Sequence, residues 1–261
     1  MANKSMLYLT KGIKLIDNYN IYHYNKNELS VLIIQGIFLC ILLGYLFYNN
    51  ILGVLVLLPF TFLYVKNKKT YYVLNRKWQL TKEFKDGLSS LIAALNAGYS
   101  VENAISQAAN DLKQMYEKES LIITEFDTIV SKLQMNQNTE EVFHDFGERS
   151  DVEDIKNFAD VFKTAKRTGG DIIRIMRSTE KTINDKIEVE SEIQTLIAGK
   201  RLEVKIMNGM PCGIILFLRV SSPGFLDPLY GNLSGVLIMS AILAVYYGIT
   251  KATEKLTDIR V

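Results

Sequence analysis

Apolar and polar positions follow two distinct patterns along this chain. No charged residue occurs between Ser30 and Val65, or between Pro228 and Thr250. A helix of about 20 apolar residues crosses the hydrocarbon core of a bilayer, and soluble domains do not expose such stretches. Between these two stretches, apolar residues recur every three or four positions, as on one face of an α-helix. The pattern predicts membrane-spanning helices on both sides of a helical domain.

The longest continuous helical pattern runs from Thr168 to Val220. Asp171 stands where a capping residue belongs, and the sequence turns apolar after Lys205 without a stop signal. We expect a soluble helix that continues directly into a membrane span. Pro211 removes a backbone hydrogen bond inside that span and favours a kink, which suits either a moving part or the fit of a neighbouring helix. One face of the soluble half carries Ile172, Met176, Thr179, Ile183 and Ile187.

From Trp78 to Lys205 the periodicity predicts four or five amphipathic helices and no strand. Gly98 ends one helix, and Ser100 begins the next as its N-cap. Asp151 is expected to cap a later helix that Gly169-Gly170 terminates. Short turns between such helices predict an antiparallel bundle. For the helices after Ser100 and Asp151, the residues expected to face the core are Val101, Ala104, Ile105, Ala108, Leu112 and Met115, and Val152, Ile155, Phe158, Val161, Phe162 and Ala165.

The apolar stretch before this bundle divides into two spans at Asn49-Asn50, because paired asparagines signal a turn. The second span, Ile51 to Val65, is short at about 22 Å. Lysines and tyrosines just after it can anchor its end at the interface. The alternative for this segment is a buried or re-entrant helix.

The distribution of basic residues predicts the topology. The two hairpin tips, Asn49-Asn50 and Ser221 to Asn232, contain no Lys or Arg, and only Arg219 lies near one of them. The positive-inside rule then places both termini and the bundle in the cytoplasm. We therefore expect an all-α, multi-pass protein of the cell membrane, with two transmembrane helix pairs flanking a cytoplasmic antiparallel helical bundle. Its parts are a lead-in over 1–29, a hairpin over 30–65, the bundle over 66–205, a second hairpin over 206–250 and a tail over 251–261.

Charge and candidate chemistry narrow the function further. The bundle segment carries 22 basic and 23 acidic side chains, which argues against nucleic acid as a partner. Cys40 and Cys212 lie in apolar stretches and show no disulfide or metal spacing. Gly199-Lys200 lacks the other residues of a phosphate loop, and His23 and His144 stand alone. We expect no catalytic, cofactor-binding or metal-binding residue.

Two groups of residues have a competing chemical interpretation. Glu188, Glu190 and Glu192 contain the donors of a divalent cation site, but at most Glu188 and Glu192 share a helix face. A solvated face is the preferred interpretation. Gly169-Gly170 precedes a helix N-terminus, where a phosphate can bind. We favour a sharp reversal between two packed helices, with Asp171 as the cap.

Several segments resemble known motifs in their order and spacing. They are Leu95 to Ile105, with its Gly98 and Ser100, then Arg149 to Phe158, then Thr168-Gly-Gly-Asp-Ile172, and finally Pro211 early in the following span. Together with the layout of spans, they resemble the type II secretion system F family. These are the inner-membrane platform proteins of type II secretion, type IV pili, tight-adherence pili and archaella. The single bundle is similar to the tight-adherence branch.

The resemblance implies a protein that is not an enzyme and that couples a cytoplasmic hexameric secretion ATPase to the assembly of pilin subunits. Its other implied partners are the lipid bilayer and a sister platform protein or a second copy of itself. Two rival functions stay open. One is a membrane signalling adaptor with a cytoplasmic helical bundle, and the other is an intramembrane transporter.

Overall fold

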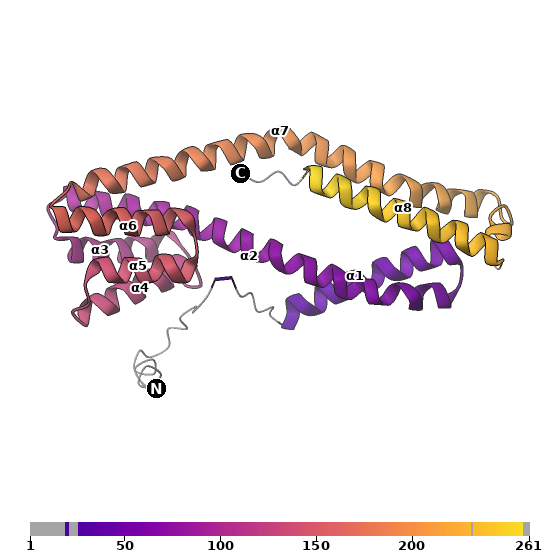
Figure 1. The fold of residues 1–261 in the computed structure, drawn as a ribbon, viewed down its shortest axis with the longest axis horizontal. Coiled ribbons are helices and arrows are strands. Elements are labelled where there is room, and N and C mark those ends of the chain that lie inside the picture. The colour runs from indigo at the N-terminus through magenta and orange to yellow at the C-terminus, as the bar shows by residue number, and fades with distance from the viewer. Residues whose placement is uncertain (1–18, 21–25, 231, 258–261) are drawn as a thin grey trace. The chain divides into compact units, whose positions relative to one another are not determined.

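The computed structural model describes residues 19–20, 26–230 and 232–257. Within these ranges the chain forms nine helices and no strand, as the periodicity predicts. They are α1 (Lys26–Tyr48), α2 (Ile51–Asn96), α3 (Val101–Met115), α4 (Leu121–Gln134), α5 (Thr139–Ser150), α6 (Glu153–Thr168), α7 (Ile172–Ser221), the 3-10 helix η2 (Asp227–Leu229) and α8 (Leu233–Thr257). Figure 1 shows their order along the chain.

The helices divide into two compact units. The first contains Tyr19-Asn20 and residues 71–187, which are the C-terminal half of α2, helices α3 to α6 and the start of α7. The second contains the described residues of 23–70 and 188–257, which are α1, the start of α2, the rest of α7, η2 and α8. The continuous helices α2 and α7 therefore belong to both units.

The first unit is a helical bundle with an aromatic core. Consecutive helices pack against each other, α3 on α4, α4 on α5 and α5 on α6. Edge-to-face contacts join the rings of the core, for example Phe84 with Phe158 at 5.4 Å and Phe143 with Phe162 at 5.2 Å between centroids. Such pairs stabilise a core beyond the area that they bury. All four phenylalanines are buried.

Two residues predicted to face this core do not. Met115 and Val161 are 58% and 49% exposed. Met115 is the last residue of α3, where the chain already leaves the bundle. Val161 follows two inward positions, Phe158 and Ala159, and lies at the edge of the apolar face of α6. A wide apolar stripe includes edge positions that solvent reaches.

The expected long helix after Asp171 is α7, which runs without interruption from Ile172 to Ser221. It passes through Pro211, which lies inside the helix. The length of α2 is a feature that the periodicity did not predict. We expected a span ending at Val65 and a separate bundle helix after Trp78, whereas one helix covers Ile51–Asn96. The charged segment between them, which includes Lys66 and Lys77, has good helix formers and no Gly or Pro to stop it.

The second unit contains the apolar hairpin of α1 and α2. The helices separate at Asn49, which takes a left-handed conformation with φ 47°, as the predicted turn requires. Small residues of α1 face α2: a Cβ at Gly44 would lie 2.9 Å from the Cα of Val54, and one at Gly36 would lie 2.6 Å from Thr61. The thiol of Cys40 donates to the carbonyl of Leu57 at 3.3 Å. Small residues at this spacing let two membrane helices approach closely.

Three helices in the described part of the chain are long and apolar enough to cross a bilayer. They are α1 over Leu29–Tyr48, α7, and α8 over Ser234–Thr253. Their apolar side chains are widely exposed, including Phe38 of α1, Phe217 of α7 and Leu237 of α8. Such surfaces suit lipid rather than water, and the chain has the features of a multi-pass membrane protein. Ile51 to Val65 is not among the three helices, and its crossing of the membrane stays a prediction.

Candidate functional site

The turn at Gly98 joins α2 to α3 through two capping devices. Gly98 has φ 89°, and its N–H donates to the carbonyl of Leu95 while that of Tyr99 donates to Ala94. This is the left-handed helix end that glycine favours. Ser100 then accepts a hydrogen bond from the N–H of Asn103 at 3.4 Å, as an N-cap does.

The turn between α6 and α7 has a different requirement at each residue. Gly169 has φ 71°, and no atom lies within 4 Å of the place where its Cβ would be. Gly170 does not have a positive φ, but its Cβ would lie 3.3 Å from that of Ala165. Asp171 caps α7 by accepting from the N–H of Arg174 at 3.0 Å. Gly169 is therefore needed for its left-handed backbone conformation. Gly170 is needed because a side chain there would crowd Ala165.

Asp151 does not cap α6, which corrects the prediction. The N-cap of α6 is Val152, without a side-chain hydrogen bond, and Asp151 takes a left-handed conformation at the end of α5. Its carboxylate binds Lys77 of α2 and Lys156 of α6, each at 2.8 Å. These hydrogen bonds hold the pKa of Asp151 well below its ordinary value. Asp151 therefore joins three helices instead of starting one.

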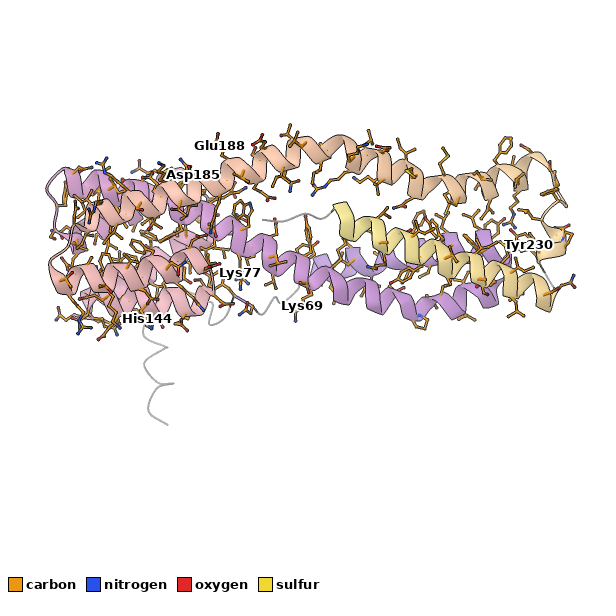
Figure 2. The ribbon with its side chains drawn as sticks, turned by 45° about the horizontal axis from the view of Figure 1, so that its top comes forward. Lys69, Lys77, His144, Asp185, Glu188 and Tyr230 are labelled. Atoms are coloured by element: carbon orange, nitrogen blue, oxygen red, sulfur yellow. The ribbon has the colours of Figure 1, made fainter. Side chains whose placement is uncertain are left out.

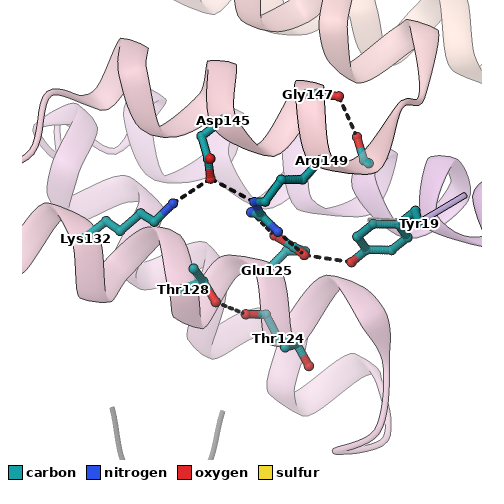
Figure 3. A network of polar contacts seen from close by, with 9 residues as sticks. Tyr19, Thr124, Glu125, Thr128, Lys132, Asp145, Gly147 and Arg149 are labelled. Atoms are coloured by element: carbon teal, nitrogen blue, oxygen red, sulfur yellow. Dashed lines mark hydrogen bonds and ion pairs between the residues drawn. The ribbon is translucent and has the colours of Figure 1, made fainter. Parts of the chain in front are cut away.

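A buried polar network lies between α4 and α5, as Figure 3 shows. Glu125 of α4 is fully buried and accepts two hydrogen bonds from the guanidinium of Arg149, at 3.0 and 2.6 Å. Arg149 also donates to Asp145 at 2.8 Å, and Lys132 donates to the same oxygen at 2.5 Å. Burial alone would raise the pKa of Asp145, but the two cations outweigh it and lower the pKa. The network ties α4 to α5.

Tyr19 completes this network from outside the helices. Its side chain is fully buried, and its hydroxyl donates to Glu125 at 2.7 Å. Burial and the neighbouring carboxylate raise the pKa of this hydroxyl, so that it stays protonated. Nothing in the periodicity of the first 29 residues pointed to this contact. The same segment contains a second Tyr-Asn pair, Tyr24-Asn25, so residue type alone did not single out Tyr19.

A second group of polar contacts joins the two hairpins of the second unit. The guanidinium of Arg219, near the end of α7, donates to the carbonyl of Tyr45 at 2.9 Å and to the side chain of Asn49. It also lies 3.9 Å from the centroid of the Tyr45 ring, a cation–π contact. Tyr230, labelled in Figure 2, donates to the carbonyl of Leu46 at 2.7 Å. The two hairpin tips therefore lie at the same end of the second unit.

Further along this unit, hydroxyl groups contact neighbouring helices. Tyr48 and Ser240 share a hydrogen bond of 2.8 Å, and Tyr246 donates to the carbonyl of Asn208 at 2.8 Å. Asn208 lies one turn before Pro211 in α7. A tyrosine hydroxyl that reaches a backbone carbonyl close to a proline is one way in which membrane helices accommodate a break in their hydrogen bonding. The kink itself stays a prediction.

The residues considered for chemistry lie apart. Gly199 and Lys200 are inside α7, so they form no loop around a phosphate. His144 is about half exposed on α5 (Figure 2), and Glu188 and Glu192 are exposed on α7. Among the described residues, no three His, Cys, Asp or Glu side chains are grouped to hold a metal ion. The structure brings together ion pairs and helix caps, which position helices.

Models of known protein families, characterised proteins and solved structures show no match to this chain.

Proposed function

We propose that this chain is a membrane platform protein of a pilus-type assembly machine, of the tight-adherence kind. In this role the bundle contacts a cytoplasmic hexameric ATPase, and the membrane helices contact pilin subunits and a sister platform protein or a second copy. One observation carries the proposal: α2 and α7 each extend without a break from the bundle into the apolar unit. Two continuous helices are a direct route for transmitting motion between the two.

The contacts of the second unit support the topology that this role requires. Arg219 and Tyr230 bind the end of α1 beside Asn49-Asn50. Both hairpin tips therefore lie at one end, as they do when both cross from the cytoplasm and return. The packing of Gly44 and Gly36 against Val54 and Thr61 brings the start of α2 back along α1. This arrangement supports our proposal of a fourth span over Ile51 to Val65, with both termini in the cytoplasm.

Cysteine labelling in intact cells tests the topology. Ser222 lies at the second hairpin tip and Ser178 on α7 in the bundle, and both are exposed. A membrane-impermeant maleimide should label Ser222→Cys from outside and Ser178→Cys only after the membrane is permeabilised. The unmodified chain, with Cys40 buried and Cys212 partly buried, gives the background. The reverse labelling pattern contradicts the proposed orientation.

Deletion and co-purification test the function. A strain that lacks the chain should make no surface filaments, and a plasmid copy should restore them. The affinity-tagged protein, cross-linked in its membrane, should co-purify with a secretion-type ATPase and pilin-like subunits. An unrelated multi-pass membrane protein with the same tag is the control. Intact filament assembly in the deletion strain would rule the proposal out.

A further inference from the structure

Tyr19 and Asn20 bind the helices of the first unit as a two-residue ligand binds a receptor. The N–H of Tyr19 donates to the carbonyl of Arg149 at 3.2 Å, and its hydroxyl donates to Glu125 at 2.7 Å. The side-chain amide of Asn20 donates to Asp151 at 3.1 Å. In each of these hydrogen bonds the dipeptide donates and the helices accept. A matched set of donors on one side and acceptors on the other is the chemistry of recognition.

The two accepting carboxylates do not depend on the dipeptide for neutralisation. Glu125 has its bidentate pair with Arg149, and Asp151 has its contacts with Lys77 and Lys156. Removing one partner of a buried ion pair is costly because it leaves a charge uncompensated. Removing Tyr19 and Asn20 leaves every one of these charges paired. The polar half of the site therefore keeps its ion pairs without the dipeptide.

The site also selects the side chain that fills it. The guanidinium carbon of Arg76 lies 4.8 Å from the centroid of the Tyr19 ring, a favourable cation–π position. The ring packs into the same apolar core as its helical neighbours, and Glu125 at its base requires a donor. A phenylalanine in place of Tyr19 keeps the ring contacts but removes the hydroxyl that donates to Glu125. A phosphorylated tyrosine brings negative charge against Glu125 and is excluded.

We propose that the bundle carries a preformed binding site for a Tyr-Asn peptide, filled here in cis by Tyr19-Asn20, and that this occupant is exchangeable. Tyr19-Asn20 is then a detachable contact of the bundle helices. A second copy of the same segment, offered in trans, competes for the site. This inference holds whether or not the proposed function is correct.

Peptide binding to the full-length chain in detergent tests the proposal. A fluorescent peptide of residues 14–21, in which Tyr19 is the one tyrosine, is titrated into the Tyr19→Ala variant, whose site is vacant, and into the unmodified chain, whose site is filled. We expect binding to the variant and at least about tenfold weaker binding to the unmodified chain. The same peptide with Phe at its tyrosine position should bind the variant about tenfold more weakly, the size of one hydrogen bond to a charged group. No binding to the variant, or equal binding to both chains, overturns the proposal.

Two controls separate a docking site from a core position. Tyr99→Ala removes a tyrosine that is 51% exposed, and this variant should bind the peptide as weakly as the unmodified chain does. Tyr19→Ala should unfold cooperatively at a lower midpoint, because the bound tyrosine stabilises the folded state, and saturating peptide should raise the midpoint again. Loss of cooperative unfolding in Tyr19→Ala shows that Tyr19 is part of the core and likewise overturns the proposal.

Discussion

Arg149 forms an ion pair with the buried carboxylate of Glu125. Glu125 is fully buried, whereas the side chain of Arg149 is 14% exposed. Arg149→Met should lower the free energy of unfolding by about 3–5 kcal/mol, because it leaves the charge of Glu125 unpaired. The double variant Glu125→Met with Arg149→Met should recover most of that loss. Urea unfolding of the full chain in mild detergent measures both.

The ion pair between Lys113 and Asp127 provides the matched control, since both side chains reach solvent. Lys113→Met should change the free energy of unfolding by less than about 1 kcal/mol. Equal stability losses in Arg149→Met and in the double variant would contradict the assignment of the cost to an unpaired charge.

Asp151 gives the bundle a sensitivity to acid whose sign follows from its lowered pKa. A carboxylate whose folded-state pKa lies below its unfolded value of about 3.9 stabilises the fold above that pH and loses the effect as pH falls further. Asp151→Asn keeps a residue that tolerates the left-handed backbone but cannot ionise. The unmodified chain should be the more stable one at pH 7, and the difference should shrink below about pH 4. A difference that is constant from pH 7 to pH 2 in thermal unfolding contradicts this.

Residue types alone predicted some of these roles and not others. Asp171 caps α7 because the cap depends on its own sequence neighbours. Asp151 has the same side chain, but its contacts with Lys77 and Lys156 come from other helices. The pairing of Glu125 with Arg149 is equally long-range. A local pattern specifies a local hydrogen bond, whereas a contact between helices depends on the packed structure.

At the scale of the helix pair, Gly44 sets how closely α1 and α2 approach. A side chain there meets the backbone of Val54, at 2.9 Å from its Cα. Gly44→Leu should therefore destabilise the second unit by about 1–3 kcal/mol through overpacking. Gly248→Leu in α8 is the control, because no atom lies within 4 Å of the Cβ position there. Equal melting temperatures of the two variants in detergent would show that the hairpin is not held by this contact.

The turn before α7 distinguishes a backbone requirement from a steric one. Gly169→Ala should cost about 1–2 kcal/mol, because an alanine at φ 71° is in the left-handed region. Gly169→Asn should cost less, since asparagine visits that region more readily. Gly170→Ala requires only a small adjustment of Ala165, so its cost should be the lowest. Chemical unfolding of the three variants gives the order, and a more costly Gly170→Ala would reverse our assignment.

Helix ends were predictable wherever the sequence marks them with Gly, Asn or Ser. The turns at Asn49, Gly98 and Gly169 all contain a residue with positive φ. The continuity of α2 was not predictable from the change of composition after Val65, because a helix needs neither apolar nor polar residues as such to continue. Periodicity specifies which face of a helix is buried. When a helix passes from an apolar to an aqueous environment, its backbone hydrogen bonds remain intact.

At the scale of the whole molecule, the charge distribution and the uncharged stretches were sufficient to predict an all-α membrane protein. The three helices that are apolar enough to cross a bilayer agree with this. The charge distribution did not predict the docking of Tyr19, because a single buried tyrosine in a polar segment has no periodicity. The sequence also contained no sign that the first compact unit ends at Ile187, since α7 continues past this residue as one helix. Composition predicts which solvent surrounds a segment, and packing decides where one compact unit ends.

The continuity of α7 is the feature on which the proposed coupling depends, and it can be broken at one residue. Ala198 is exposed inside α7, between the bundle and Pro211. Ala198→Pro removes a backbone hydrogen bond and costs the helix about 3 kcal/mol locally, whereas Ala198→Ser leaves the helix intact. In cells that lack the native gene, Ala198→Pro should insert in the membrane at normal levels but fail to restore filaments, while Ala198→Ser restores them. Because the bundle and the apolar unit each keep their own contacts, filament assembly by Ala198→Pro would show that motion does not pass through α7.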